Sequence, residues 1–298
     1  MHWIAATLLS AFFAGVNELS SKHAIQANAV TPVLFFTMLY CAAAWIGLMV
    51  VQVFHPGSLP ASLVTDPITL VQHLQLVLKA AIVAAAWATT YFGLKHLPVS
   101  LASPIRATGP LWTFLGAMVI LAERPTLLES LGIVTTLVSF LGLSLVGRRE
   151  GVNFHRDKWV GFLILGTLLN ALSAVYDKYL LGTVHLSVPT VQAWYSIYML
   201  VFFTPLTIGW KRRWWPRNEF QWRWSILLIA VSMLLGDYLY FAALRNPTAL
   251  VSLVISLRRG STLVSFAGGI LLFREENGLQ KLPAVIGILV GIVLTALG

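Results

Sequence analysis

Charged residues are scarce in this sequence. Of its 298 residues only 10% are Asp, Glu, Lys or Arg, whereas 58% are apolar, and the mean hydropathy is +0.81. A soluble domain carries about 25% charged residues. The scarcity excludes an ordinary soluble domain and predicts an all-α integral membrane protein, most of which lies within the bilayer or at its interfaces.

Cysteine and the common enzyme motifs are also lacking. Cys41 is the single cysteine, which excludes a disulfide framework and a cysteine-based metal site. The chain has no Gly-x-x-x-x-Gly-Lys-Ser/Thr loop, no His-Glu-x-x-His motif and no Ser-His-Asp set with a supporting spacing. The histidines fall at helix ends or in loops. We therefore expect no enzymatic activity, no metal and no cofactor.

Acidic residues are few relative to basic ones, with 11 Asp and Glu against 20 Lys and Arg. Such an excess of positive charge can indicate nucleic-acid binding. Here, however, the basic residues lie mainly in short loops between apolar runs, where the positive-inside rule and anionic lipid head groups explain them. The lipid bilayer is the expected partner, and nucleic acid is not.

What the chain has in abundance is long apolar runs. A helix needs roughly 20 mostly apolar residues to span the hydrocarbon core. The sequence contains ten runs near this length, and the loops between them are too short to hold a soluble domain. The ten predicted transmembrane helices are Trp3–Ala24, Thr31–Phe54, Val71–Leu94, Val99–Leu121, Thr126–Val146, Trp159–Leu181, Val188–Trp210, Trp224–Leu244, Thr248–Phe273 and Leu282–Leu297.

The second half of the chain resembles the first. Trp3–Lys22 aligns without a gap with Trp159–Lys178, so that Trp falls on Trp and Lys on Lys. Tyr91–Pro98 corresponds to Phe241–Pro247 with one gap, and each segment ends one apolar run and begins the next. These matches indicate an internal repeat.

The number of helices in each half determines whether the two halves have the same or opposite orientations in the membrane. Because each half has five runs, the second half must enter the membrane in the opposite sense to the first. We therefore predict two inverted five-helix repeats, at residues 1–146 and 159–298, joined by a basic linker at 147–158. In such architectures a binding site lies near the midplane between the repeats.

Two adjacent arginines, Arg258 and Arg259, occupy the middle of the ninth run. An arginine at the centre of a membrane helix costs about 2.5–3.5 kcal/mol or more unless it faces protein, water or a ligand. The fourth run, which is the repeat partner of the ninth, carries Arg106. The guanidinium group offers a bidentate fork to carboxylates and phosphates. These residues predict a locally positive cavity that binds such an anion.

Other side chains of the membrane helices are candidates for the same cavity. Helical spacing places Arg258, Ser261, Thr262 and Ser265 on one face. A Trp or Tyr in a membrane helix more often packs or anchors at the interface, so the aromatic candidates remain open. The predicted substrate-binding residues are Arg258, Arg259, Arg106, Ser261, Thr262, Ser265, Trp87, Tyr91, Tyr195, Tyr238, Tyr240 and Asn17.

A structural ion pair is the alternative role for either arginine of the ninth run. Adjacent helical residues point about 100° apart, so both cannot enter one cavity. The spacing favours Arg258 for the ligand and Arg259 for the ion pair, although the reverse remains open. The candidates for an ion pair or for proton coupling are Asp237, Glu18, Asp177 and Lys178.

Together these features resemble the drug/metabolite transporter (DMT) superfamily, in its ten-helix EamA-type branch. The resemblance covers the whole chain and includes the hinges at Tyr91–Pro98 and Phe241–Pro247 and the Gly-to-Glu segments Gly116–Glu123 and Gly268–Glu275. It implies a secondary transporter or exporter of a small polar or amphipathic metabolite, working by alternating access as a monomer or homodimer in the plasma (inner) membrane. Two alternatives remain: a flippase for a lipid-linked phosphate or sugar, and a membrane-embedded transferase or hydrolase.

The distribution of basic residues predicts the orientation of the chain. The connections that follow the odd-numbered helices hold most of them, and the opposite side holds Arg124, Lys178, Arg245 and Lys79. By the positive-inside rule the basic side is cytoplasmic and both termini lie outside the cytoplasm, whereas the resemblance implies cytoplasmic termini. The basic side holds Lys22, Lys95, Arg148, Arg149, Arg156, Lys158, Lys211, Arg212, Arg213, Arg217, Arg223, Arg274 and Lys281.

This orientation can be tested with reporter fusions. A reporter enzyme that is active only outside the cytoplasm should be active when it is fused after Gly298 and inactive when it is fused after Glu150, in the basic linker. Activity at Glu150 and inactivity at Gly298 would show the opposite orientation.

Overall fold

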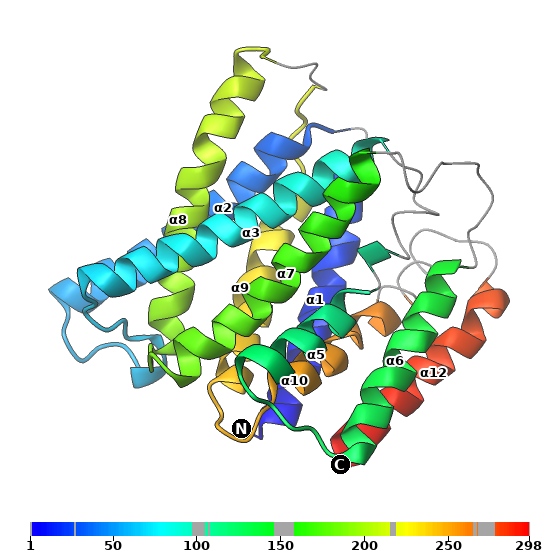
Figure 1. The fold of residues 1–298 in the computed structure, drawn as a ribbon. Helices are drawn as coiled ribbons and strands as arrows, with labels where there is room; N and C mark the ends of the chain where they lie inside the picture. Colours follow the sequence, from blue (N-terminus) through cyan, green and yellow to red (C-terminus); the bar gives the residue numbers. More distant parts are fainter. Residues whose placement is uncertain are drawn as a thin grey trace.

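The structure, a computed structural model, describes residues 2–26, 28–96, 105–106, 108–145, 158–214, 219–264, 267 and 278–297. The elements within these ranges are helices (Figure 1). In chain order they are α1 (Trp3–Ile25), α2 (Val30–Phe54), the short 3-10 helix η1 (Ala61–Leu63), α3 (Leu70–His96), α5 (Gly109–Ile120), α6 (Leu127–Leu145), α7 (Lys158–Gly182), α8 (Val188–Lys211), α9 (Ser225–Leu244), α10 (Val251–Arg258) and α12 (Gly278–Leu297).

Within the described ranges, six helices are long and apolar enough to cross a membrane. They are α1, α2, the part of α3 from Leu70 to Thr90, α7, α8 and α9, and shorter apolar helices include much of α5, α6 and α12. Large apolar side chains are exposed on the outer faces, for example Phe54, Val119 and Leu127. Such faces suit lipid, since water would not solvate them. The chain is an all-helical, multi-pass integral membrane protein.

The predicted fourth helix is interrupted. We expected one continuous helix over Val99–Leu121, but α5 begins only at Gly109, after a turn at Thr108. Pro110 lies in the first turn of α5, where a missing N–H removes no intrahelical hydrogen bond. The turn at Thr108 therefore lies two positions after Arg106. Residues 99–104 and residue 107 of the predicted helix lie outside the described ranges.

The predicted ninth helix is interrupted as well, so its prediction as one continuous run was wrong. Helix α10 ends at Arg258, and a turn at Arg259 and Gly260 precedes helical residues 261–264. The backbone N–H of Gly260 donates to the Leu257 carbonyl at 2.9 Å, a tight turn that departs from the α-helical ladder. The arginine pair thus lies at a break, and the predicted common helical face does not continue past Arg258.

The main packing partners come from opposite halves of the sequence. Helix α1 packs along α9, α3 along α7, α2 along α8 and α6 along α12. Each pair joins a helix that precedes residue 146 to one that follows residue 157. The two halves are therefore interleaved, and the described parts of both termini lie at the same end of the molecule (Figure 1).

Small residues bring α6 and α12 into close contact. A Cβ atom added to Gly132 of α6 would lie 2.3 Å from Thr295 Oγ1 and 2.5 Å from the Thr295 backbone nitrogen. On α12, a Cβ added to Gly291 would lie 2.2 Å from Thr136 Oγ1. The Gly287-x-x-x-Gly291 spacing therefore serves packing within the molecule.

This contact predicts a position-specific effect of glycine substitution. Gly132→Ala should lower the free energy of unfolding by about 1–3 kcal/mol, because its methyl group would meet the backbone of α12. Gly142→Ala, on the same helix, has no atom within 4 Å of the added Cβ and should be neutral or stabilising by up to about 1 kcal/mol. Thermal unfolding of the purified protein in detergent measures both, and equal melting temperatures would contradict the close contact.

Candidate functional site

A cavity of about 840 Å³ lies among the interleaved helices. Residues of α1, α2, α3, α5, α7, α9 and α10 line it, together with Phe140 of α6 and Tyr195 of α8. A cavity of this volume holds a small metabolite. Its charged lining residues are Glu18, Lys79, Arg106, Asp177, Asp237, Arg258 and Arg259.

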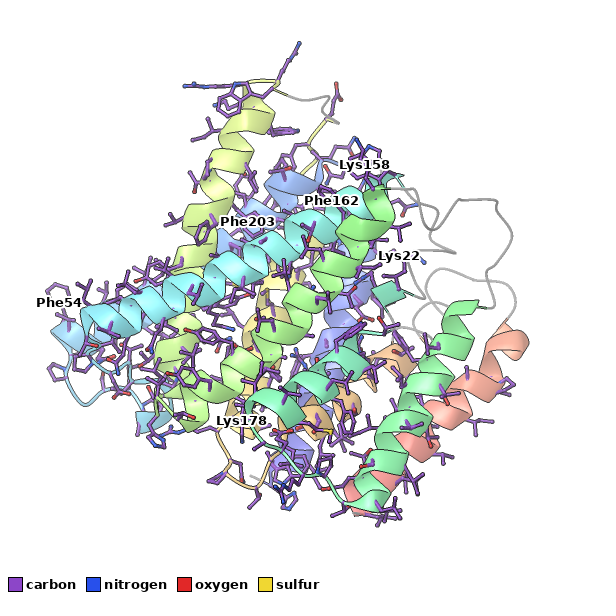
Figure 2. The ribbon with its side chains drawn as sticks, viewed as in Figure 1. Lys22, Phe54, Lys158, Phe162, Lys178 and Phe203 are labelled. Atoms are coloured by element: carbon purple, nitrogen blue, oxygen red, sulfur yellow. The ribbon has the colours of Figure 1, made fainter. Side chains whose placement is uncertain are left out.

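The cavity extends toward one end of the helices. Ser21 and Ile25, near the end of α1, and Val30, at the start of α2, line it at that end. Toward the opposite end, the lining stops at Asp177 in α7 and at Phe241 in α9. Figure 2 marks the two ends: Lys22 and Lys158 lie toward the first, and Lys178 lies toward the second. The cavity therefore approaches the side that carries most of the basic loop residues.

A buried ion pair forms the deep end of the cavity. The Lys79 ammonium of α3 donates to the Asp177 carboxylate of α7, and these residues are 2% and 4% exposed. The Tyr240 hydroxyl donates to the other carboxylate oxygen at 3.4 Å. The Lys79 nitrogen also lies 4.5 Å from the centre of the Tyr195 ring. Lys79 thus lies inside the protein, and counting it with the basic residues of one membrane side was wrong.

A second ion pair joins α9 and α10. Arg258 Nη2 donates to Asp237 Oδ1 at 3.2 Å, and the guanidinium carbon lies 4.3 Å from the centre of the Tyr240 ring. We expected Arg259 to be the ion-paired arginine and Arg258 to be the free one. The structure instead pairs Arg258 with Asp237, and both arginines line the cavity, although we expected only one of them to enter it.

Arg106 and Arg259 face the cavity near the start of α5. A Cβ added to Gly109 would lie 3.4 Å from Arg259 Nη2, so the guanidinium group rests against the first residue of that helix. Arg259 also lies 5.1 Å from the centre of the Phe140 ring. Neither arginine belongs to the Lys79–Asp177 or the Arg258–Asp237 ion pair.

Glu18 of α1 is the acidic residue that interacts electrostatically with both Arg106 and Arg259. It also accepts a hydrogen bond from the Ser261 hydroxyl at 3.4 Å. The amino-terminal end of α5 contributes a partial positive charge at the same place. One carboxylate therefore faces two guanidinium groups and a positive helix end, and the region is positive on balance.

The family of the chain follows from its sequence similarity. Residues 1–145 match the sequence model of the EamA-like transporter family, which is part of the DMT superfamily. The chain belongs to this family. Members of the EamA-like family are transporters rather than enzymes.

Comparison with solved structures shows that the fold of the chain has a known counterpart. One crystal structure, described only as that of a protein, resembles this EamA-like protein with a TM-score of 0.68 and 15% sequence identity. The similarity covers 98% of this chain and 96% of the other. At that identity the likeness shows the fold alone. No curated protein matches the sequence.

Most of the predicted binding residues of this EamA-like protein lie together. Besides the three arginines, the cavity lining includes Asn17, Trp87, Tyr195, Tyr240 and Thr262. The Asn17 amide donates to the Ile229 carbonyl at 3.1 Å, which fixes α1 against α9. The cavity therefore combines charged, amide and aromatic groups.

Other predicted residues lie elsewhere. Ser261 is 6% exposed and is not part of the cavity lining, although it contacts Glu18. Tyr238 donates to the Ser62 carbonyl at 2.7 Å, which places its hydroxyl against the 3-10 helix η1. The side chain of Tyr91 and the whole of Ser265 lie outside the described part of the chain.

Lys178 has a structural role. Its ammonium donates to the carbonyls of Leu244, Asn246 and Ala249 at 2.9, 2.8 and 2.6 Å. These carbonyls lie at and beyond the end of α9, where helical C=O groups lack partners and a cation is favourable. Lys178 therefore caps α9, and it is not part of the cavity lining.

Sequence reasoning missed the structural roles of Lys79 and Glu123. Lys79 could have been found, because it is an isolated lysine within the apolar run Val71–Leu94. Glu123, just after α5, accepts hydrogen bonds from the Val251 N–H at 2.5 Å and from the Ser252 hydroxyl at 2.7 Å. It thus caps the start of α10, a role that the Gly-to-Glu pattern alone does not reveal.

The Arg258–Asp237 pair predicts non-additive mutational effects. Arg258→Met and Asp237→Asn should each lower the melting temperature, since each leaves the partner charge uncompensated. The double variant should lose less than the sum of the two, with a coupling energy of about 1–2 kcal/mol. Unfolding of all four proteins measures the coupling, and additive losses would show that the two groups do not stabilise each other.

Proposed function

We propose that this protein is a secondary transporter of a small metabolite that bears a carboxylate or a phosphate, and that it works by alternating access. The observation that carries the proposal is the position of Arg106 and Arg259. Both line the cavity, and neither belongs to the Lys79–Asp177 or the Arg258–Asp237 ion pair. A guanidinium group at membrane depth is costly without a counter-charge, which an anionic substrate would supply.

The geometry suits an anionic group between the arginines and the start of α5. Arg259 rests against Gly109, so an anion bound there would also meet the positive end of the helix. Arginine binds carboxylate and phosphate in a bidentate manner, which fixes orientation as well as charge. Glu18 offsets part of the positive charge and favours a substrate of low net negative charge.

The rest of the lining favours a substrate with an apolar part. Trp87, Tyr195, Phe140 and Met233 contribute apolar surface to the cavity. Aromatic walls with a few convergent polar groups are typical of sites that orient small amphipathic ligands. We therefore assign a small amphipathic metabolite to this cavity rather than a purely polar ion.

The packing pattern supports two inverted repeats of five helices. In the repeat, α1 corresponds to α7, α2 to α8, α3 to α9 and α6 to α12. If each helix is replaced by its counterpart, the packed pair α1–α9 becomes the packed pair α7–α3, and the pairs α2–α8 and α6–α12 remain the same pairs. This is the pattern that a two-fold relation would produce. The interruptions before α5 and after α10 also fall in the two runs that we matched as repeat partners.

The direction of access supports a transporter that loads from the cytoplasm. The cavity approaches the side of the α1–α2 connection, which the positive-inside rule assigns to the cytoplasm. An exporter in the plasma membrane would take up its solute in this conformation. Release would require the opposite side to open, which is the second half of an alternating-access cycle.

Substitution of the arginines tests the function. A thermal-shift screen of the purified protein against monocarboxylic acids, amino acids and sugar phosphates should identify an anionic ligand. Arg106→Gln and Arg259→Gln should each weaken its binding by about 10- to 100-fold, the value of a charge-assisted hydrogen bond. Arg245→Gln removes an exposed arginine just after α9 and should leave binding unchanged.

Counterflow of the labelled ligand into proteoliposomes then tests transport. We expect uptake with the parent protein and a loss of uptake with either cavity variant. Binding that is equal in the cavity variants and in Arg245→Gln would contradict the anion site. Binding without counterflow would contradict the transporter and direct attention to lipid flipping or catalysis.

A further inference from the structure

The Lys79–Asp177 pair lies directly beneath the apolar core that closes one side of the cavity. We call this core the plug; it comprises Leu76, Leu180, Leu181, Leu244, Val251 and the buried apolar side chains packed with them. Each of the named residues is at most 1% exposed. The named plug residues come from the start of α3, the ends of α7 and α9, and the start of α10, opposite the end of the cavity that Ser21, Ile25 and Val30 line.

Helical spacing connects the ion pair to the plug. Lys79 lies one turn from Leu76 on α3, and Asp177 lies one turn from Leu180 on α7. Both charged residues line the cavity, whereas Leu76 and Leu180 belong to the plug. The pair is therefore the layer at which the polar cavity ends and the apolar closure begins.

Lys79 and Asp177 each provide the counter-charge that allows the other to be buried. The Lys79 ammonium donates to Asp177 and otherwise faces the rings of Tyr195 and Phe241, at 4.5 and 4.9 Å from their centres. Aromatic faces stabilise a cation only weakly in comparison with a carboxylate. Loss of either charge would leave the other one buried without compensation, which is strongly destabilising.

We propose that Asp177 is a proton-binding site and that its protonation opens the plug. A proton adds to a carboxylate oxygen of Asp177, which becomes a neutral carboxylic acid. Lys79 keeps its proton and loses its counter-charge. A closed plug over an uncompensated ammonium group is unfavourable, so the equilibrium moves to the state in which water or an anion reaches Lys79.

The consequence for transport rests on the proposed function. An anionic substrate would replace the Asp177 carboxylate as the counter-charge of Lys79. One proton on Asp177 would then move with each monoanion, so that the coupled movement is electrically neutral. The gate itself does not depend on the identity of the substrate and can be tested without one.

The charged and titratable groups around Asp177 limit where the proton can go. They are Lys79 from α3, Tyr195 from α8, Tyr240 and Asp237 from α9, and Arg258 from α10. Helix α5, which also packs against α7, contains no titratable side chain. Lysine, arginine and tyrosine keep their protons in mild acid, so the carboxylates Asp177 and Asp237 are the groups to distinguish.

Cysteine labelling reports whether the plug is open. In a background in which Cys41 is replaced by Ala, Leu181→Cys places a thiol in the plug, and Thr183→Cys places one at an exposed site two residues away. A water-soluble maleimide is applied to each variant in lipid nanodiscs over a range of pH. The labelling rate of the Leu181→Cys variant is divided by that of the Thr183→Cys variant, and this ratio cancels the pH dependence of the thiol reaction.

We expect this ratio to rise as the pH falls, by up to about tenfold per pH unit for one linked proton. Asp177→Asn should give a high ratio at every pH. Lys79→Met combined with Asp177→Leu should give a low ratio at every pH, because an uncharged apolar pair keeps the plug closed. Asp237→Asn should retain the rise.

Several results of the labelling experiment would contradict the proposal. A ratio that does not change with pH in the background protein would overturn the proposal, as would a pH response that survives in Asp177→Asn or disappears in Asp237→Asn. If Asp177→Asn does not fold, the variant that combines Lys79→Met with Asp177→Leu provides the test. A labelling ratio that still changes with pH in that variant would show that Asp177 is not the proton-binding site. A failure of transport would appear in the counterflow measurement and would leave the labelling result unaffected.

Discussion

Charged groups inside a membrane protein need a partner of opposite charge, and this requirement determines how the helices of this protein are arranged. Lys79 is neutralised by Asp177, and Arg258 by Asp237, through contacts that link α3 to α7 and α9 to α10. Tyr240 touches both pairs, through its hydroxyl on Asp177 and its ring on Arg258. A buried ion pair contributes little net stability, but the loss of one partner is costly. The pairs therefore specify which helices face one another more than they strengthen the fold.

The same requirement applies to the backbone. A helix that ends within the membrane exposes N–H or C=O groups that water cannot reach. Glu123 accepts from the first residues of α10, and Lys178 donates to carbonyls at and beyond the end of α9. An acid at a helix start and a base at a helix end also have the favourable sign for the helix dipole. Charged side chains thus allow helices to be interrupted at depth.

The sequence predicted the class of the fold well and the site in part. Apolar runs located α1, α2, α3, α7, α8 and α9 to within two residues, because the thickness of the bilayer dictates their length, whereas α5 and α10 are much shorter than the runs that predicted them. The arginines and Asn17 were found because a polar group in an apolar run is costly wherever it points. The pairing of Arg258 and the burial of Lys79 could not be predicted in the same way. Asp177 is 98 positions from Lys79, and only the packing of α3 on α7 brings them together. Spacing along one helix also could not show that the helix stops at Arg258.

The cationic residues of the cavity fall into two groups, those in ion pairs and the arginines Arg106 and Arg259. The deep pairs are internally neutral, whereas Arg106 and Arg259 face the lumen with Glu18 as the acid that acts on both. A protein that needed these arginines only for packing would gain by placing a carboxylate against each. Instead the positive excess lies at the start of α5, where the helix adds to it. An anion that occupies this position completes the neutralisation that the chain leaves open, and Lys79, one layer deeper, is the next cation it would meet if Asp177 were neutral.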